Sequence, residues 1–230
     1  MTKGFWFRAS VALGFSAALG LLGPACADNE STFYIRACLV PDNDCAVQAT
    51  LDAPTQQAGL LDTAFSSTGY RCAMLVGNQL AALGNDSLRT ETSRIVVYAF
   101  DITVADAASG GQLASYSVPA AGFVDPGSAP DPGYGVVDGL LLDIGTANSI
   151  SAQAGANGFP QVLVSVIARG RTLGGTELES PPWTFPITVC NNCTCAGASG
   201  KCTPDDLSSS TVDCRFGSDG RCHFVDTDCP

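Results

Sequence analysis

The sequence predicts an all-β protein: an antiparallel β-sandwich, immunoglobulin-like in shape, with a small disulfide-rich C-terminal extension. Three observations predict it. Short segments of alternating apolar residues recur between turn signals, no long segment has a helical apolar period, and seven of the 11 cysteines lie between 190 and 230. Such a series of short strands is typical of a sandwich, and a closed barrel is the alternative arrangement.

The first predicted strand covers 33–40, the Pro41-Asp42-Asn43-Asp44 turn follows, and 45–50 return as a second strand. The clearest strand is 94–104, because every second side chain from Val96 to Val104 is apolar. The other predicted strands are 70–80, 111–118, 136–144, 161–168 and 177–190.

Three segments are predicted from composition rather than from alternation. Residues 51–69 fit either a loop or a short helix that begins at Pro54, and 119–135, rich in Pro, Gly and Asp, form a surface loop. Residues 161–168 are apolar on both faces, which places their strand centrally. Pro181-Pro182 mark a bulge or a sheet edge.

The first 27 residues are typical of a secretory signal peptide. Lys3 and Arg8 precede an apolar run from Val11 to Leu22. That run is shorter than the roughly 20 apolar residues that a spanning helix needs, and no later stretch approaches that length. Cleavage after Ala25-Cys26-Ala27 would follow the small-x-small rule and leave Asp28 as the first residue.

A second processing route starts from the same segment. Leu22-Gly23-Pro24-Ala25-Cys26 resembles a bacterial lipoprotein box, in which Cys26 would be lipidated and become the first residue. Ala25 matches the box, whereas Gly23 and Pro24 depart from it. Through residues 1–30 the chain resembles envelope lipoproteins of Gram-negative bacteria. The resemblance implies an envelope location and carries no activity with it.

Charge excludes one class of partner. Without residues 1–27 the chain keeps 9 basic and 22 acidic side chains, so its net charge is 9 − 22 = −13. A surface of that sign repels nucleic-acid phosphates and anionic lipid headgroups. We therefore expect no nucleic-acid partner, and contact with a membrane only through a lipid anchor.

The cysteine content indicates an oxidising compartment. Either processing route removes Cys26 from pairing, and ten cysteines then allow five bridges. A hairpin at 41–44 would pair Cys38 with Cys45, which leaves Cys72 to pair with Cys190 at the end of the last strand. The disulfide candidates are Cys38, Cys45, Cys72, Cys190, Cys193, Cys195, Cys202, Cys214, Cys222 and Cys229.

Cys190-x-x-Cys193-x-Cys195 also has the spacing of metal ligands, with His223 further along. Behind a signal peptide, disulfides are the better interpretation. A redox-active CxxC normally lies at a helix start, and no helix is predicted near Cys190. We expect no metal ligands here.

No catalytic residues emerge. His223 is the only histidine and lies in the cysteine-rich tail, and no serine stands in a G-x-S-x-G frame. The segment from Gly197 to Lys201 resembles a phosphate loop but lacks its first Gly and its final Ser/Thr, which are Cys195 and Cys202 here.

Acidic residues cluster in predicted loops. Loop carboxylates suit Ca²⁺, which takes six to eight oxygen ligands. Calcium is therefore the one cofactor that the pattern admits, although Asp also favours turns and keeps exported proteins soluble. The residues concerned are Asp42, Asp44, Asp125, Asp131, Asp205, Asp206, Asp219, Asp226 and Asp228.

The sequence thus predicts a signal peptide over 1–27, a β-sandwich domain over 28–189 and a cysteine-rich extension over 190–230. We expect a non-catalytic exported envelope or surface protein, a binding or structural module whose partner is an envelope protein or polysaccharide. If lipidated, it belongs to the outer membrane, periplasm or cell surface; otherwise it is periplasmic or secreted. The alternatives are a calcium-dependent adhesion or assembly module and a secreted carboxylate-based hydrolase.

Overall fold

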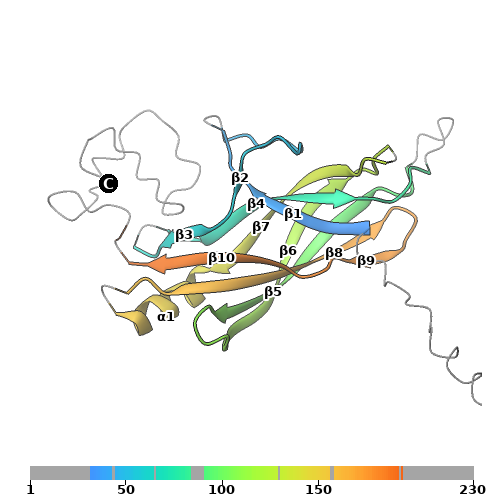
Figure 1. Ribbon diagram of the computed structural model, residues 1–230. Coiled ribbons are helices and arrows are strands. Elements are labelled where there is room, and N and C mark those ends of the chain that lie inside the picture. The colour runs from blue at the N-terminus through green and yellow to red at the C-terminus, as the bar shows by residue number, and fades with distance from the viewer. Residues whose placement is uncertain are drawn as a thin grey trace, which may run out of the picture.

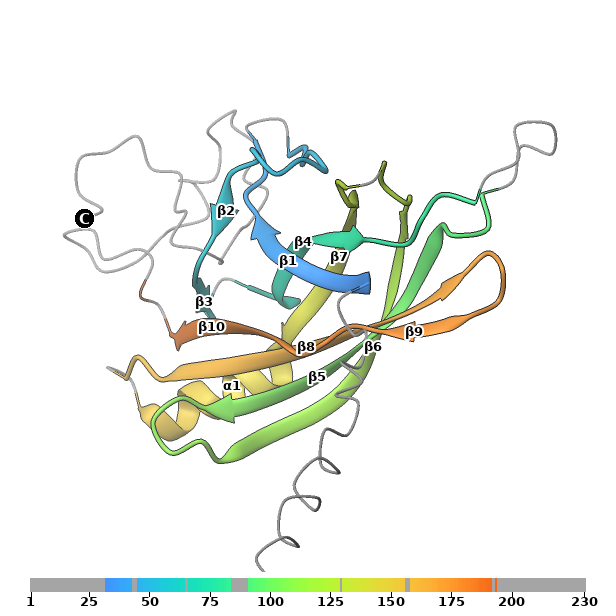
Figure 2. The same cartoon turned by 45° about the vertical axis from the view of Figure 1, so that its right-hand side comes forward.

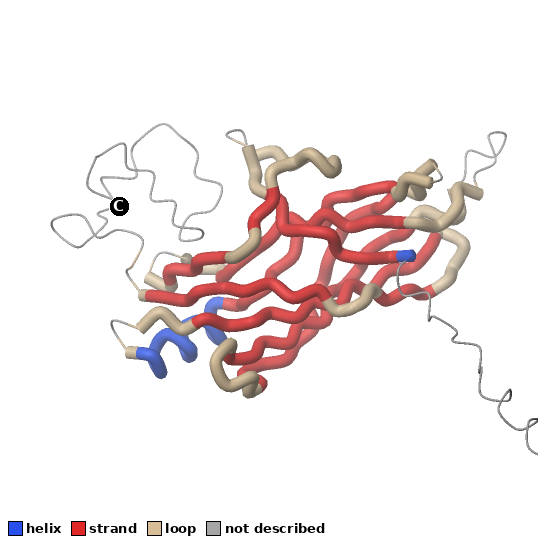
Figure 3. Tube along the Cα trace, viewed as in Figure 1, coloured by secondary structure: helices blue, strands red, loops and turns tan. Residues whose placement is uncertain are grey.

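The computed structural model describes residues 32–42, 45–64, 66–83, 91–128, 130–155, 158–191 and 193. Within these ranges the chain forms ten strands and one helix (Figures 1 and 3). In chain order the elements are β1 (Phe33–Leu39), β2 (Thr55–Gln56), β3 (Gly59–Asp62), β4 (Gly69–Asn78), β5 (Ile95–Asp106), β6 (Gln112–Val124), β7 (Gly133–Asp143), α1 (Ile144–Ala154), β8 (Gln161–Thr172), β9 (Glu177–Glu179) and β10 (Trp183–Cys190).

The ten strands belong to one sheet that curls into a nearly closed barrel (Figure 2). Neighbouring strands follow the order β2-β1-β4-β7-β6-β5-β8-β10-β3, and β9 pairs with β8 beside this row. All neighbours are antiparallel except β3 and β10, which run parallel. The sheet is therefore mixed.

One short segment joins the two edges of the sheet. β2 pairs with β1, and β3, which begins only three residues after Gln56, pairs with β10. The bend between them lets consecutive residues cover both edges, which would otherwise expose unpaired backbone groups. Gly59 permits the close approach, because a Cβ there would lie 2.6 Å from Cζ of the buried Tyr70 ring on β4.

The pairing of β6 with β7 is the sparsest join in the sheet. Its register contains the single pair Ala121↔Asp138. Further along, the Tyr116 hydroxyl donates to the Leu141 carbonyl at 3.0 Å and accepts from the Asp143 amide at 3.3 Å. A side chain thus bridges the two strands where backbone pairing has ended.

The barrel interior is filled by inward-facing side chains of the strands. Asn78 is the main polar residue among them: its amide donates to the Ser93 and Val124 carbonyls, and its oxygen accepts from the Leu80 amide. A buried amide with all these partners ties the ends of β4, β5 and β6 together. The largest fully buried residues are Tyr70, Phe33, Phe100, Phe185, Leu39, Leu61, Met74, Leu75, Ile95, Ile102, Leu141 and Leu142.

Helix α1 packs at one end of the barrel, where it contacts β4, β7 and β10. Its N-cap is Asp143, whose carboxylate accepts from the Thr146 amide at 2.9 Å. The helix buries Ala147, Ile150 and Ser151 toward the barrel. In the described parts of the chain, no helix is long and apolar enough to cross a membrane.

The predicted strands agree with the structure in most places. Predicted strands coincide with β1, β4, β5, β7 and β8, and β8 does lie between β5 and β10. Its second face is nevertheless on the outside of the barrel, where Leu163 is 37 % exposed. The last predicted strand is divided into β9 and β10 at Pro181-Pro182, and β9 is an edge strand as the prolines suggested.

Two predictions of local structure were wrong, and one helix was not predicted. Residues 45–50 form bends and loop rather than a second strand, because β2 and β4 occupy the two places beside β1. β6 continues to Val124 and β7 begins at Gly133, so both ends of the predicted loop 119–135 are strand. Helix α1 was not predicted, since its three buried residues are too few and too small to produce a strong helical period.

The fold is mostly β, as expected, but the antiparallel sandwich of immunoglobulin-like shape is not confirmed. The single curled sheet and the parallel β3–β10 pair are closer to the barrel that the same strands allowed. Sandwiches and barrels both require alternating inward and outward side chains, so the strand pattern alone does not separate them.

The predicted Cys38–Cys45 bridge was also wrong. Cys38 on β1 is bonded to Cys72 on the neighbouring strand β4, with Cα atoms 5.7 Å apart. Close by, the Asp42 amide donates to the Ala46 carbonyl, and Cys45 is exposed with φ +62°. Asn43 and Asp44 of the predicted turn lie outside the described residues. Cys45 is disulfide-bonded, but not to Cys38.

Candidate functional site

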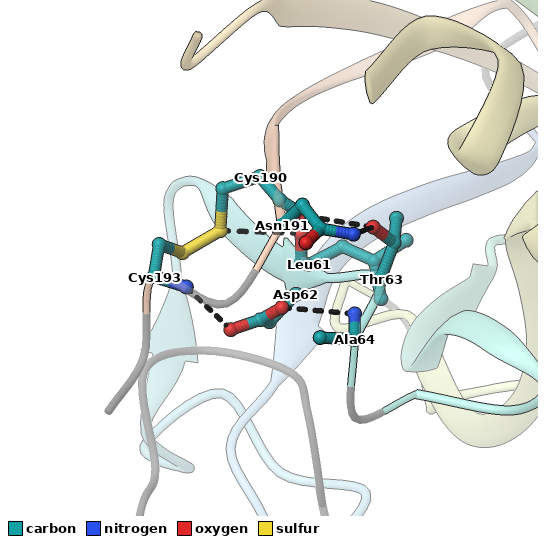
Figure 4. The surroundings of a disulfide bond; sticks show 7 residues. All are labelled: Leu61, Asp62, Thr63, Ala64, Cys190, Asn191 and Cys193. Atoms are coloured by element: carbon teal, nitrogen blue, oxygen red, sulfur yellow. Dashed lines mark hydrogen bonds between the residues drawn. A yellow bond between two sulfur atoms is a disulfide. The ribbon is translucent and has the colours of Figure 1, made fainter. Parts of the chain in front are cut away.

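The candidate site lies at the α1 end of the barrel, where β3 and β10 finish side by side. The parallel register places Asp62 beside Cys190, the last residues of their strands. The chain then turns at Thr63 after β3 and continues to Asn191 and Cys193 after β10. Two segments more than 120 residues apart in sequence thus form one surface, drawn in Figure 4.

A disulfide joins Cys190 to Cys193 across this surface. The predicted Cys72–Cys190 bridge was therefore wrong, because each of these cysteines has a nearer partner. The two sulfur-bearing residues differ in exposure: Cys190 is 1 % exposed, whereas Cys193 is half-buried. Cys193 is therefore the more accessible of the two cysteines.

Asp62 is fully buried beside the disulfide. One carboxylate oxygen accepts from the Cys193 amide at 2.8 Å, and the other accepts from the Ala64 amide at 3.0 Å. Figure 4 shows the carboxylate between these two backbone groups. The carboxylate therefore holds Cys193 against the end of β3 by a contact that does not involve sulfur.

Thr63 and Asn191 complete the surroundings of the disulfide. The Thr63 amide and hydroxyl both donate to the Cys190 carbonyl, at 2.9 and 3.0 Å. The Asn191 amide in turn donates to the Thr63 hydroxyl at 3.2 Å. These bonds hold the end of β10 at Cys190 and Asn191 against Thr63 (Figure 4).

A pocket of about 220 Å³ adjoins the disulfide on the α1 side. Thr63 and Asn191 form one wall, and the second half of α1 forms the other. The lining offers hydroxyl, amide and small apolar groups and carries no charge. We call it the rim pocket; its residues are Thr63, Asn148, Ser151, Ala152, Gly155 and Asn191.

The two disulfides in which both cysteines are described differ in what they contribute to stability. In the chain-entropy model, a bridge between residues 34 apart, such as Cys38–Cys72, stabilises the fold by about 4 kcal/mol. A bridge between residues 3 apart, such as Cys190–Cys193, contributes only about 2 kcal/mol. Of these two bridges, Cys38–Cys72 therefore stabilises the fold more.

The same three groups could in principle ligate a metal. Asp62, Cys190 and Cys193 each place one ligand atom within 4.8 Å of the others, and among the described residues they are the one such group of three. A metal ion would require thiolates at both cysteines, and the disulfide occupies both sulfurs. In this oxidised form the geometry supports no metal ion.

The predicted acidic loops do not gather into one site within the described residues. Asp42 accepts from the Ala46 amide in its turn, and Asp125 forms an ion pair with Arg94. Asp131 lies in the same loop as Asp125, closed by a hydrogen bond from its amide to the Ser128 carbonyl. The carboxylates of Asp42 and Asp125 thus have separate local partners, and these contacts give no support to a calcium or hydrolase site.

Several predicted site residues lie outside the described residues, so their placement is not tested. These are the lipidation candidate Cys26, the carboxylates of Asp44, Asp205, Asp206, Asp219, Asp226 and Asp228, the lone His223, and the disulfide candidates Cys195, Cys202, Cys214, Cys222 and Cys229.

Asp62 was missed by sequence reasoning. It lies in 51–69, which was left open between loop and helix, and no local pattern shows that it is buried beside Cys193. The Asn148 and Ser151 side chains were missed with α1. A polar Asp-x-x-Thr start at Asp143, which is an N-cap pattern, was the one signal that could have revealed the helix.

Comparisons with known proteins give no further guide to this site: no protein-family model, curated protein sequence or solved structure matches the chain.

Proposed function

We propose that this protein is an exported, non-catalytic binding module of the bacterial envelope, and that the rim pocket holds a neutral, hydroxyl-rich ligand such as part of a polysaccharide. The observation that carries the proposal is the lining of the pocket. Its hydroxyl and amide groups can both donate and accept hydrogen bonds, and small apolar groups lie between them.

The rest of the barrel supports a binding role at its rim. Large apolar side chains such as Phe33, Phe100 and Phe185 are buried in the barrel core and offer no polar groups to a hydroxyl-rich ligand. Binding sites on β scaffolds commonly lie where loops and strand ends meet, because the scaffold holds these loops in place. The rim pocket is such a place.

Charge indicates which ligands to expect. The predicted mature chain carries −13, which disfavours anionic ligands over the whole surface. The rim pocket offers no positive side chain to offset that field. A neutral saccharide therefore fits the pocket better than a phosphate, a nucleic acid or an acidic polymer.

The first test measures saccharide binding by isothermal titration calorimetry. Neutral glucose and N-acetylglucosamine oligomers are the probes, with acidic uronate oligomers of equal length for comparison. We expect the neutral series to bind and the acidic series not to. Asn148→Ala should weaken binding about 2- to 10-fold, the effect of one neutral hydrogen bond.

Gln153→Ala is the matched control, because Gln153 is an exposed amide on the same helix that does not line the rim pocket. Its affinity should equal that of the wild type. Equal losses in both variants, or no binding by any neutral oligomer, would contradict the proposed site.

Export is tested by the intact mass of the mature protein from a Gram-negative host. A mass with acyl chains on Cys26 would establish a lipid-anchored envelope protein, and a chain that begins at Asp28 would establish a free exported one. We expect the acylated mass, on the resemblance of residues 22–26 to a lipoprotein box. An uncleaved chain that begins at Met1 would contradict export.

A further inference from the structure

The Cys190–Cys193 disulfide contributes little to the stability of the fold, so stability alone is a poor reason for its presence. It closes a loop of three residues' separation, whereas Cys38–Cys72 spans 34 and lies wholly within the barrel wall. A short bridge restrains the unfolded chain less than a long one. The bridge lies at the rim of the barrel, where Cys193 is half-buried, and this position favours a chemical role.

The two cysteines differ in exposure, and this difference determines which sulfur an incoming thiolate attacks. Cys190 is 1 % exposed and Cys193 is half-buried, so Cys193 is the more accessible of the two for an incoming thiolate. The sulfur of Cys190 then becomes the leaving group. It lies 3.6 Å from the Leu61 carbonyl, an acceptor already in place for the S–H that would form.

The main chain is held by contacts that survive opening of the S–S bond. The Cys193 amide donates to Asp62, and the Cys190 carbonyl accepts from the Thr63 amide and hydroxyl. Both cysteines therefore stay close together when reduced, so the bond can open and close again without movement of β3 or β10.

We propose that Cys190–Cys193 is a thiol–disulfide exchange site that accepts electrons from a dithiol partner, with Cys193 as the attacked residue. The inference does not depend on the ligand proposed for the rim pocket. Asn191, which lies between the two cysteines, also lines that pocket, so a partner seated there would lie next to the disulfide.

The exchange balances in two steps. A partner thiolate attacks Sγ of Cys193, the S–S bond breaks, and its electron pair leaves on Sγ of Cys190, which takes up the proton that the attacking thiol released. The partner's second thiol then attacks the partner sulfur that is bonded to Cys193. This breaks the mixed disulfide, and Cys193 takes up the proton and leaves as a thiol. The dithiol is oxidised to a disulfide, and the two cysteines are reduced by two electrons.

The first experiment treats the folded, exported wild-type protein with graded dithiothreitol, traps free thiols with iodoacetamide and maps them by peptide mass. We expect Cys190 and Cys193 to be alkylated at dithiothreitol concentrations at least 10-fold below those needed for Cys38 and Cys72. Simultaneous reduction of both pairs, or earlier reduction of Cys38–Cys72, would overturn the proposal.

The second experiment compares Cys190→Ser, which leaves the accessible Cys193, with Cys193→Ser, which leaves the buried Cys190. After titration confirms one new free thiol in each, both react with oxidised glutathione. We expect Cys193 to form the mixed disulfide at least 10-fold faster than Cys190. Equal rates would show that neither sulfur is the preferred point of attack. If either variant fails to fold, the wild-type reduction series decides the question.

Discussion

At the scale of single residues, a few polar side chains, buried or half-buried, replace backbone pairing that the sheet lacks. Tyr116 is the clearest case, because its hydroxyl bridges β6 to β7 beyond the single backbone pair of that join. Asn78 does the same for the ends of β4, β5 and β6. Such residues decide local stability, since losing them leaves buried backbone groups unpaired.

Replacement of Tyr116 by Phe should test this bridge. The change removes both hydrogen bonds and leaves the Leu141 carbonyl and the Asp143 amide without this partner. We expect the free energy of unfolding to fall by about 1–3 kcal/mol, measured by urea denaturation at neutral pH. A loss well under 0.5 kcal/mol would mean that the hydroxyl is not part of the join.

The pH dependence gives an independent check of the same bridge. Burial, and less strongly the nearby Asp143 carboxylate, raise the pKa of Tyr116 from 10.0 to about 12. The folded state therefore favours the neutral phenol, and this stabilisation is complete below pH 10 and lost as the pH rises toward 12. The difference between wild type and Tyr116→Phe should shrink over that interval; a constant difference would contradict the assignment.

At the scale of elements, α1 depends on its cap more than on its apolar face. The helix buries only Ala147, Ile150 and Ser151, and its first turn contains no acidic residue besides the Asp143 cap. It nevertheless carries Asn148 and Ser151, which line the rim pocket. The position of the pocket wall therefore rests on the bond between the Asp143 carboxylate and the Thr146 amide.

Asp143→Ala should destabilise the protein by about 1 kcal/mol, the usual effect of removing an N-cap, as measured by urea denaturation. Asp143→Asn keeps a capping oxygen and should retain most of the stability. If Asp143→Ala and Asp143→Asn lose the same amount, the charge of Asp143 rather than its capping bond is responsible.

At the scale of the whole molecule, closure of the barrel depends on residues 55–62. The strands β2 and β3 in this segment are too short to be recognised by alternation. Nevertheless β2 pairs with β1, and β3 pairs with β10. This placement also brings Asp62 beside Cys193. The same contacts that close the sheet therefore assemble the candidate site.

The local sequence pattern was sufficient to predict the long strands. It was insufficient to predict which strands and which cysteines pair with one another. Alternation over 94–104 predicted β5, because a half-buried strand imposes a period of two on its own residues. The partner of Cys38 was mispredicted, because a turn at 41–44 suggests a hairpin whereas β4 is the true neighbour of β1. Sequence distance was a poor guide to which cysteine lies near.

The sequence by itself determined the mostly β character of the chain, its acidic surface and the pool of cysteines available for bridges, since each of these follows from residue type or local period. The tertiary structure alone decided the curl of the sheet, the Cys38–Cys72 and Cys190–Cys193 pairs, and the burial of Asp62 beside Cys193. The physical reason is that strand pairing joins residues more than 100 positions apart in the sequence. No local sequence pattern encodes that such residues lie close together in space.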